Sequence, residues 1–167
     1  MLSSCRRAFA IRTTIGGPFP RRCTSQRSTD ACASGLLDGT TFAFICMDAG
    51  EPKKLAIRKC EEMGIPFVDV GMGLELVDGS LGGILRVTAS TPDMRTHVHG
   101  GRISFGGAGD ENDLYATNIQ VADLNALNAA MAVVKWKKIR GFYRDLEREH
   151  HCTYTTDGNM LINGDLA

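Results

Sequence analysis

A strand–helix–strand pattern restricts the folds open to this chain more than any other feature of its sequence. Phe42–Met47 is a continuous apolar run of strand length, as expected for a strand covered on both faces. Asp48–Pro52 has the composition of a turn, and a helix is expected over Lys53–Met63, ending at Gly64. Ile65–Val70 then predicts a second strand. Because two strands joined through a helix run parallel with a right-handed crossover, the fold class is α/β with a βαβ unit.

A β-hairpin and a long connection are expected next. Leu74–Val77 and Ile84–Thr88 have strand character, and Asp78-Gly79 between them is a hairpin turn signal. From Ala89 to Asp113 the chain is Gly-rich and polar without periodicity, and connections of this length are usually functional or mobile. Gly106–Gly109 lies in this stretch, but no apolar strand precedes it and no helix follows at once. We therefore interpret it as a flexible connection and not as a phosphate loop.

A long helix is expected to close the fold. Thr117 and Gln120 have the spacing of a capping box. Apolar residues at steps of three and four predict its buried face: Leu124, Leu127, Met131 and Val134. The basic cluster Lys135–Arg140 suits the negative end of a helix, and Gly141 ends it. We interpret the cluster as a solvated helix end, and residues 142–167 as a loosely packed polar tail.

The amino-terminal segment differs in composition from the rest. Residues 1–37 hold six arginines and one acidic residue, a formal charge of +5, while the whole chain has a net charge of zero. This segment lacks the apolar content to offset chain entropy, so residues 1–36 are expected to be disordered. Three interpretations stay open: a mitochondrial transit peptide, a mis-assigned start or frameshift before a true coding segment, and a solvated basic tail.

Charge and hydropathy also exclude some partners. A net charge of zero gives no argument for binding nucleic acid or a membrane surface. No apolar run approaches the roughly 20 residues that cross a bilayer. The six cysteines form no C-x-x-C pair and no convincing disulfide framework, so a reducing cytoplasm is the expected location, with the mitochondrion as the alternative.

Individual cysteines and histidines are weak candidates for chemistry. Cys46 in the first strand and Cys60 in the helix are expected to pack in the core. Cys152 follows His150-His151, which can lower its pKa, but an inert tail thiol is the favoured interpretation. His97 and His99 have strand-face spacing for a metal yet lack a third ligand, so a polar loop is favoured.

Polar residues of the long helix leave two interpretations open. Asn125 and Asn128 fall near the boundary of its inner face. They can bind a partner subunit or pair with buried polar groups of the chain itself.

Asp48 is the sharpest candidate site residue. It follows a buried parallel strand directly, and ligands of open α/β sheets bind at that edge. A carboxylate there can hold a magnesium ion bridging nucleotide phosphates. Aspartate is also a favoured N-cap, so capping of the following helix is the competing interpretation.

The same residues resemble a known family. The run FICMDAGEPKKLAIRKCEEMGIPFVDVGMGLELVDGSLGGILRV is similar to the second half of ThiF/MoeB/HesA-type domains, which include the ubiquitin-activating enzymes. The stretch YATNIQVADLNALNAAMAVVKWKKIRGFYRD is similar to the closing helix of bacterial ThiF-like proteins. The resemblance covers about Leu37 to Asn159, with residues 160–167 as a tail. It implies the carboxyl-terminal part of a Rossmann-like domain.

The resemblance also implies an activity. Family members use ATP and magnesium to adenylate the carboxyl-terminal glycine of a ubiquitin-like or sulfur-carrier protein. Asp48 matches the family's aspartate that contacts Mg·ATP and the adenylate, which makes it the implied catalytic, cofactor-binding and metal-binding residue. A Gly-rich loop that passes over the modifier's tail would correspond to Gly106–Gly109.

Departures from the family pattern shape the remaining expectations. Residues 1–37 supply no glycine-rich turn in a strand–turn–helix context, no acidic residue for the ribose, and no catalytic Arg or phosphate-contacting Lys. We therefore favour a truncated or frameshifted gene and expect the chain alone to be inactive. Ala89–Asp113 contains no cysteine, so a thioester is doubtful. The alternatives are a non-catalytic dimerisation or binding remnant, such as a homodimer, and a fragment of an NAD-dependent dehydrogenase.

Overall fold

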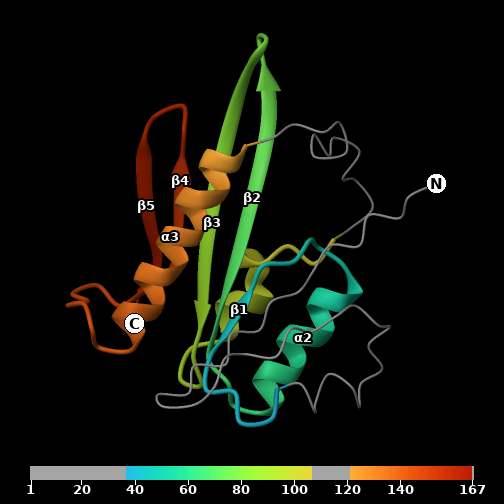
Figure 1. Cartoon of the computed structure of the whole chain (residues 1–167), viewed down its shortest axis with the longest axis vertical. Coiled ribbons are helices and arrows are strands. Elements are labelled where there is room, and N and C mark those ends of the chain that lie inside the picture. Colours follow the sequence, from blue (N-terminus) through green and yellow to red (C-terminus); the bar gives the residue numbers. More distant parts are fainter. Residues whose placement is uncertain (1–36, 107–120, 167) are drawn as a thin grey trace.

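The computed structural model describes residues 37–106 and 121–166, which form a mixed α/β fold around one open sheet (Figure 1). The strand order is β1-β2-β3-β4-β5. The strands are β1 (Ala43–Ile45), β2 (Phe67–Val77), β3 (Ser80–Ser90), β4 (Glu149–Thr155) and β5 (Met160–Leu166). The helices are α2 (Glu51–Glu62), α3 (Ala122–Ile139) and a short π-helical segment, η1 (Val98–Arg102). The predicted α/β class is thus confirmed. The expectations for residues 1–36, Thr117, Gln120 and Gly107–Gly109 lie outside the described residues.

The predicted βαβ unit is confirmed, with different boundaries. β1 pairs parallel to β2, with Ala43 opposite Phe67 and Ile45 opposite Asp69. β1 has only three residues, because the chain leaves the sheet after Ile45. α2 begins at Glu51, with a proline in its first turn, where a missing N–H breaks no helical hydrogen bond.

The second strand is much longer than expected. We predicted that it would end at Gly71, and this is wrong, because β2 runs on to Val77 as one arm of a hairpin. Every second residue of β2 from Val70 onward is apolar and lies on the same face of the sheet: Val70, Met72, Leu74 and Leu76. The apolar pattern of a strand therefore continues past Gly71 and Gly73. The Asp78-Gly79 turn is confirmed: both residues have positive φ, 50° and 78°, as a two-residue hairpin turn requires.

α3 covers the sheet with a face that differs from the predicted one. Its buried residues are Asn128, Ala132 and Lys135. Leu124 packs onto Gly83 of β3 as expected, but Leu127 and Val134 are 40% and 44% exposed, so their placement in the core was wrong. Asn128 and Lys135 occupy the inner face of α3, and its outer face is largely apolar. The spacing of apolar residues therefore predicted the wrong buried face for this helix. The predicted end at Gly141 is confirmed by its φ of 72° and a hydrogen bond from its N–H to Lys138 O.

The segment after α3 belongs to the sheet, so its prediction as a loosely packed tail was wrong. β4 pairs antiparallel to β3, with Val87 opposite Cys152, and β5 pairs antiparallel to β4. α3 is therefore not the closing element of the fold. The strand sequence Glu149–Thr155 is mostly polar, and this hides the alternation that usually identifies a strand.

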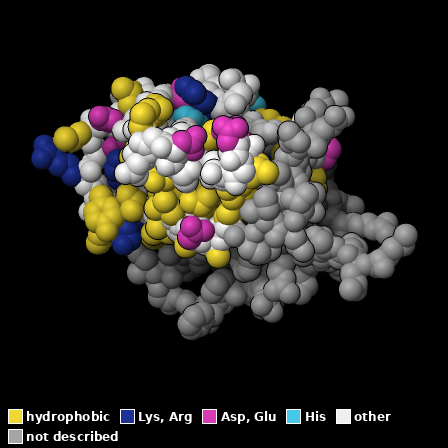
Figure 2. Space-filling model, turned by 90° about the horizontal axis from the view of Figure 1, so that it is seen from above, with side chains coloured by type: hydrophobic (Ala, Val, Ile, Leu, Met, Phe, Trp, Pro, Cys, Tyr) yellow, Lys and Arg dark blue, Asp and Glu magenta, His cyan; other side chains and the backbone are white. Residues whose placement is uncertain are grey.

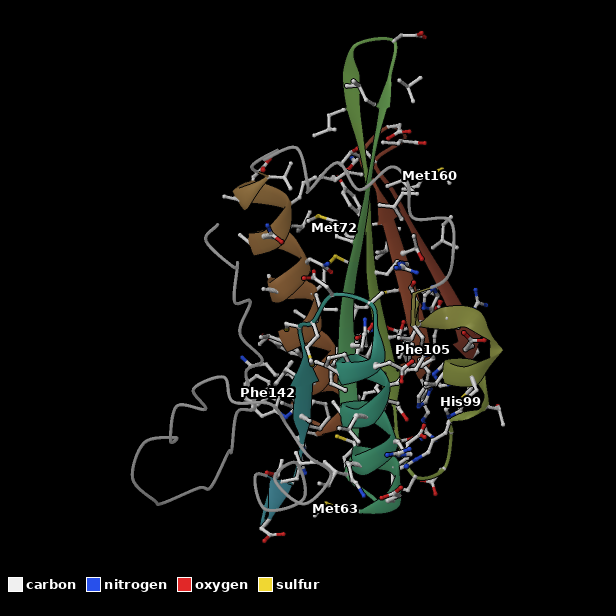
Figure 3. All side chains as sticks on the ribbon, turned by 90° about the vertical axis from the view of Figure 1, so that its right-hand side faces the viewer. Met63, Met72, His99, Phe105, Phe142 and Met160 are labelled. Carbon is white, nitrogen blue, oxygen red and sulfur yellow. The ribbon has the colours of Figure 1, made fainter. Side chains whose placement is uncertain are left out.

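Two hydrophobic clusters hold the layers together, one on each face of the sheet. Figure 3 shows the sheet nearly edge-on, with α3 on one side and η1 on the other. The cluster shared with α2 and η1 is Ala43, Ile45, Ile57, Cys60, Ile65, Phe67, Val98 and Ile103. The cluster under α3 is Phe42, Val68, Val87, Ala89, Ala132 and Cys152. Within the described ranges, no helix has both the length and the apolar content to cross a membrane.

Candidate functional site at the carboxyl edge of β1

Asp48 lies at the edge of the sheet where the parallel strand β1 ends, and its side chain is exposed. The competing interpretation, that it caps the following helix, is wrong. The N-cap of α2 is Gly50, at φ 140°, and no side chain donates or accepts a capping hydrogen bond there. A glycine is required at this φ because other residues rarely adopt it. The turn therefore leaves Asp48 exposed at the kind of edge where open α/β sheets usually bind their ligands.

A buried ion pair fixes the position of this turn. Lys53 in the first turn of α2 places its Nζ 2.7 Å from Oδ1 of Asp69 on β2, and both side chains are about 5% exposed or less. Asp69 is the partner of Ile45, the last residue of β1. Burial raises the pKa of the Asp69 carboxyl, and the nearby Lys53 opposes this. The pair therefore joins the start of α2 to the sheet beside the last residue of β1.

A third charged residue lies on the same face of the sheet. Arg86 of β3 is opposite Gly71 of β2, and its guanidinium lies over that glycine. Sequence reasoning missed Lys53, Asp69 and Arg86. Arg86 is the single charged residue of β3, which was a signal for it, whereas Lys53 is one of many charged residues in α2 and so did not stand out.

The chain returns to this edge after η1. Phe105 packs against the α2-side cluster, and a Cβ on Gly106 would lie 3.6 Å from the backbone nitrogen of Gly50. The expectation of an unstructured connection from Ala89 onward is wrong for its first part, because β3 extends to Ser90 and η1 follows, and residues 107–113 lie outside the described residues. The described part of the connection thus brings Gly106 beside the turn that bears Asp48.

The two candidate metal-binding histidines do not act together. His97 is buried and donates from Nε2 to Ala89 O at 2.7 Å. His99 is exposed, pairs with Glu61 at 3.0 Å and stacks on Phe105, as its position in Figure 3 illustrates. The described residues contain no group of three or more His, Cys, Asp or Glu side chains able to hold a metal.

The cysteines divide differently from the prediction. Cys60 is buried as expected, and burial raises its pKa to about 11. Cys46 is exposed, so its assignment to the core was wrong, because β1 ends one residue earlier. Cys152 is not in a tail but in the cluster under α3. Burial raises its pKa, in line with the favoured interpretation of an inert thiol and not with activation by the neighbouring histidines.

Polar residues of α3 serve the fold. Asn128 is buried and donates from Nδ2 to Gly71 O at 2.8 Å, whereas Asn125 is exposed. Lys135 is buried and pairs with Glu149 of β4. The interpretation of the basic cluster as a solvated helix end is therefore wrong for Lys135.

The described residues offer a single carboxylate, Asp48, as a metal ligand at this edge. Asp48 supplies one exposed carboxylate and the described residues add no further ligand cluster. Mg²⁺ is commonly bound by one or two carboxylates, with water and substrate phosphates completing an octahedral shell. A dedicated protein cage for a metal does not fit these residues.

Scans of the sequence against models of known protein families, and against curated proteins, gave no match.

Proposed function

We propose that the carboxyl edge of β1 is part of a Mg·ATP site in a Rossmann-like, ThiF-type adenylating domain. The observation that supports this most directly is the exposed Asp48 at the end of a parallel strand, in a turn where it does not cap α2. Asp48 would hold the magnesium ion that accompanies the nucleotide. The protein substrate would be a ubiquitin-like or sulfur-carrier protein with a carboxyl-terminal glycine.

The reaction we propose for the site is acyl activation. The terminal carboxylate of the modifier takes AMP from ATP, and pyrophosphate leaves. Asp48 would supply a carboxylate beside the phosphates, and the Lys53–Asp69 pair would help to fix it by holding the start of α2 next to the end of β1. Because the described residues include no phosphate loop, we expect binding of Mg·ATP by this chain without ATP–pyrophosphate exchange.

Replacing Asp48 by Asn tests the nucleotide site. Loss of the charge is expected to raise the Kd for Mg·ATP roughly tenfold, about 1.4 kcal/mol, because a neutral amide is a poorer magnesium ligand. Isothermal titration calorimetry at fixed free magnesium measures the change. The matched control is Asp78→Asn, an exposed aspartate in the hairpin turn, which should bind as the unchanged chain does.

Two outcomes would refute this assignment. One is the absence of any Mg·ATP binding by the unchanged chain. The other is equal affinity of the Asp48→Asn and Asp78→Asn variants. A different result would contradict the expectation that this chain does not turn over ATP: the unchanged chain exchanges pyrophosphate into ATP, and the Asp48→Asn variant does not.

A homodimer is a second candidate, and edge strand β5 favours it. β5 has β4 on one side, and no other described strand pairs with it. Its apolar side chains are more than half exposed: Met160, Leu161, Ile162 and Leu166. An antiparallel pairing of two β5 strands centred on Asn163 would place Met160 opposite Leu166 and Ile162 opposite Gly164. This register is self-complementary, as a two-fold interface requires.

Figure 2, which views the molecule from above, shows hydrophobic side chains gathered on the described part of that face. In the hairpin, Leu76 and Val77 are 59% and 54% exposed. The homodimer that we propose would use β5 and leave this hairpin end uncovered. The two surfaces can be tested separately.

Ile162→Lys is expected to convert such a dimer to a monomer, because it places like charges near the two-fold axis. Size-exclusion chromatography with light scattering gives the mass directly. The control is Val133→Lys, an equally apolar, 43% exposed site on α3. A monomeric unchanged chain, or a dimer that survives Ile162→Lys, would exclude pairing through β5.

A further inference from the structure

Arg86 has an unusual setting on the face of the sheet that bears α2. Atoms of its guanidinium lie 3.2–3.5 Å from the point where a Cβ on Gly71 would sit. Glycine at this position lets the cation lie flat on the strand. The side chain is half-buried, and no hydrogen bond or ion pair from the described residues engages it.

The charges around Arg86 leave it uncompensated. Asp69 is the neighbouring carboxylate, but it is already paired with Lys53 at 2.7 Å. On the other side lies His151 of β4, whose pKa is lowered by burial; Arg102 and Arg86 lower it further and Asp165 raises it. Lys53, Arg86 and Asp69 form a cluster of two cations and one carboxylate, with a net charge of +1.

Of the other acidic groups on this face, Asp165 of β5 is paired with Arg102 at 2.7 Å. Two more lie farther along the hairpin. Glu75 and Asp157 flank Gly82, which is opposite Glu75. Glu75 is four residues beyond Gly71 on β2, roughly 14 Å at the usual rise of a strand. Neither group is placed to neutralise Arg86.

Next to the guanidinium is an uncovered piece of strand. No atom of the described residues lies within 4 Å of a Cβ built on Gly73, and Ile84, its cross-strand partner, is 39% exposed. A ligand group there would contact backbone and one aliphatic side chain, with the cation at its edge. This position is two residues beyond Gly71, on the side away from the Lys53–Asp69 pair.

We propose that Arg86 is an oxyanion-binding residue that takes a carboxylate or phosphate group placed over Gly73. Arg presents a planar fork of donors that matches either group bidentately. This inference deepens the proposed function and rests on it for the source of the anion. That source is either the terminal carboxylate of a modifier protein or a phosphate of the nucleotide.

The test uses two probes on the full chain. Inorganic pyrophosphate represents the phosphate source, and a short peptide ending in Gly-Gly with a free carboxylate represents the modifier tail. The same peptide with an amidated end is the control ligand. We expect one probe to shift the backbone amide resonances of Gly71, Gly73 and Ile84, and Arg86→Gln to weaken that binding at least tenfold.

Two further variants separate geometry from charge. Arg144→Gln removes an exposed arginine elsewhere and should leave binding unchanged. Gly71→Ala retains the charge of Arg86 but displaces its guanidinium, so it should also weaken binding. Asp48→Asn should not alter binding of the magnesium-free probes, so failure of the nucleotide site and failure of this inference are distinguishable. Equal binding by Arg86→Gln and Arg144→Gln, or no resonance shift with either probe, would overturn it.

Discussion

Replacing Glu149 by Gln is expected to destabilise the fold by roughly 3–5 kcal/mol, because it leaves a buried lysine without its counter-ion. Glu149 Oε1 pairs with Lys135 Nζ of α3 and lies 2.8 Å from Lys138 Nζ. The side chains of Lys135 and Glu149 are 3% and 5% exposed. Gln has nearly the same shape, so the loss reports the charge and not the packing. The midpoint and slope of urea denaturation measure it.

The control for this variant is Asp93→Asn, at an exposed site whose change should fall within about 0.5 kcal/mol. A Glu149→Gln variant as stable as Asp93→Asn would show that the pair contributes nothing. It would also remove the argument that α3 is held to β4 through this contact.

The Glu149 carboxylate should also make the free energy of unfolding depend on pH in a distinct way. Burial alone raises the pKa of Glu149, but hydrogen bonds from Lys135 and Lys138 outweigh it and lower the pKa from 4.5 to about 2. A lowered pKa contributes stability that is complete above about pH 4.5 and is lost as the pH falls toward 2. The full shift corresponds to about 3 kcal/mol.

The two histidines of β4 also make the stability of the fold depend on acid, equally in the unchanged chain and in Glu149→Gln. Burial lowers the pKa of His150 and of His151, so their contribution to stability is present above about pH 6.5 and declines below it. The difference in unfolding free energy between the unchanged chain and Glu149→Gln should therefore stay constant from pH 7 to 5. It should shrink only below pH 4.5, and shrinkage already at pH 6 would contradict this assignment.

Local signals in the sequence were sufficient to predict the hairpin turn, the end of α3 and the βαβ unit. The Asp78-Gly79 turn needs positive φ at both positions, which few residue pairs tolerate. Gly141 ends α3 for a similar reason. The apolar run of β1 and the helix after it required a parallel partner, and β2 is that partner.

Features decided by tertiary contacts could not be predicted in this way. Lys135 and Asn128 are polar, so hydrophobic periodicity assigned the buried face of α3 to Leu127 and Val134 instead. Each buried polar group has a partner from a distant segment: Glu149 for the lysine and Gly71 O for the asparagine. The same cause hid β4, whose polar sequence is stabilised by pairing with β3.

The candidate site shows the same division. The position of Asp48 followed from strand and turn signals, whereas its failure to cap α2 depends on the backbone of Gly50. Lys53 and Asp69 are 16 positions apart and meet only because α2 packs beside β2. No local pattern distinguishes these two residues from solvated charges.

Replacing Asp69 by Asn is expected to cost roughly 3–5 kcal/mol and to loosen the start of α2, because Lys53 would be buried without its counter-ion. Urea denaturation measures the loss of stability. Lys53→Met combined with Asp69→Leu should recover most of it, since a buried ion pair can be replaced by apolar side chains at little cost. A double variant no more stable than Asp69→Asn would show that packing, and not the unpaired charge, explains the loss.

A second measurement locates the effect of Asp69→Asn at the candidate site. Partial burial raises the pKa of the Cys46 thiol, Asp69 raises it further, and Lys53 lowers it. Removing the aspartate leaves the lysine unopposed, so the Cys46 pKa should fall and its alkylation at pH 7–8 should accelerate. Mass spectrometry of the modified peptide separates Cys46 from Cys60 and Cys152, which are buried. Acceleration at all three cysteines would indicate global unfolding, whereas acceleration at Cys46 alone would show that the Lys53–Asp69 pair sets the environment of the turn carrying Asp48.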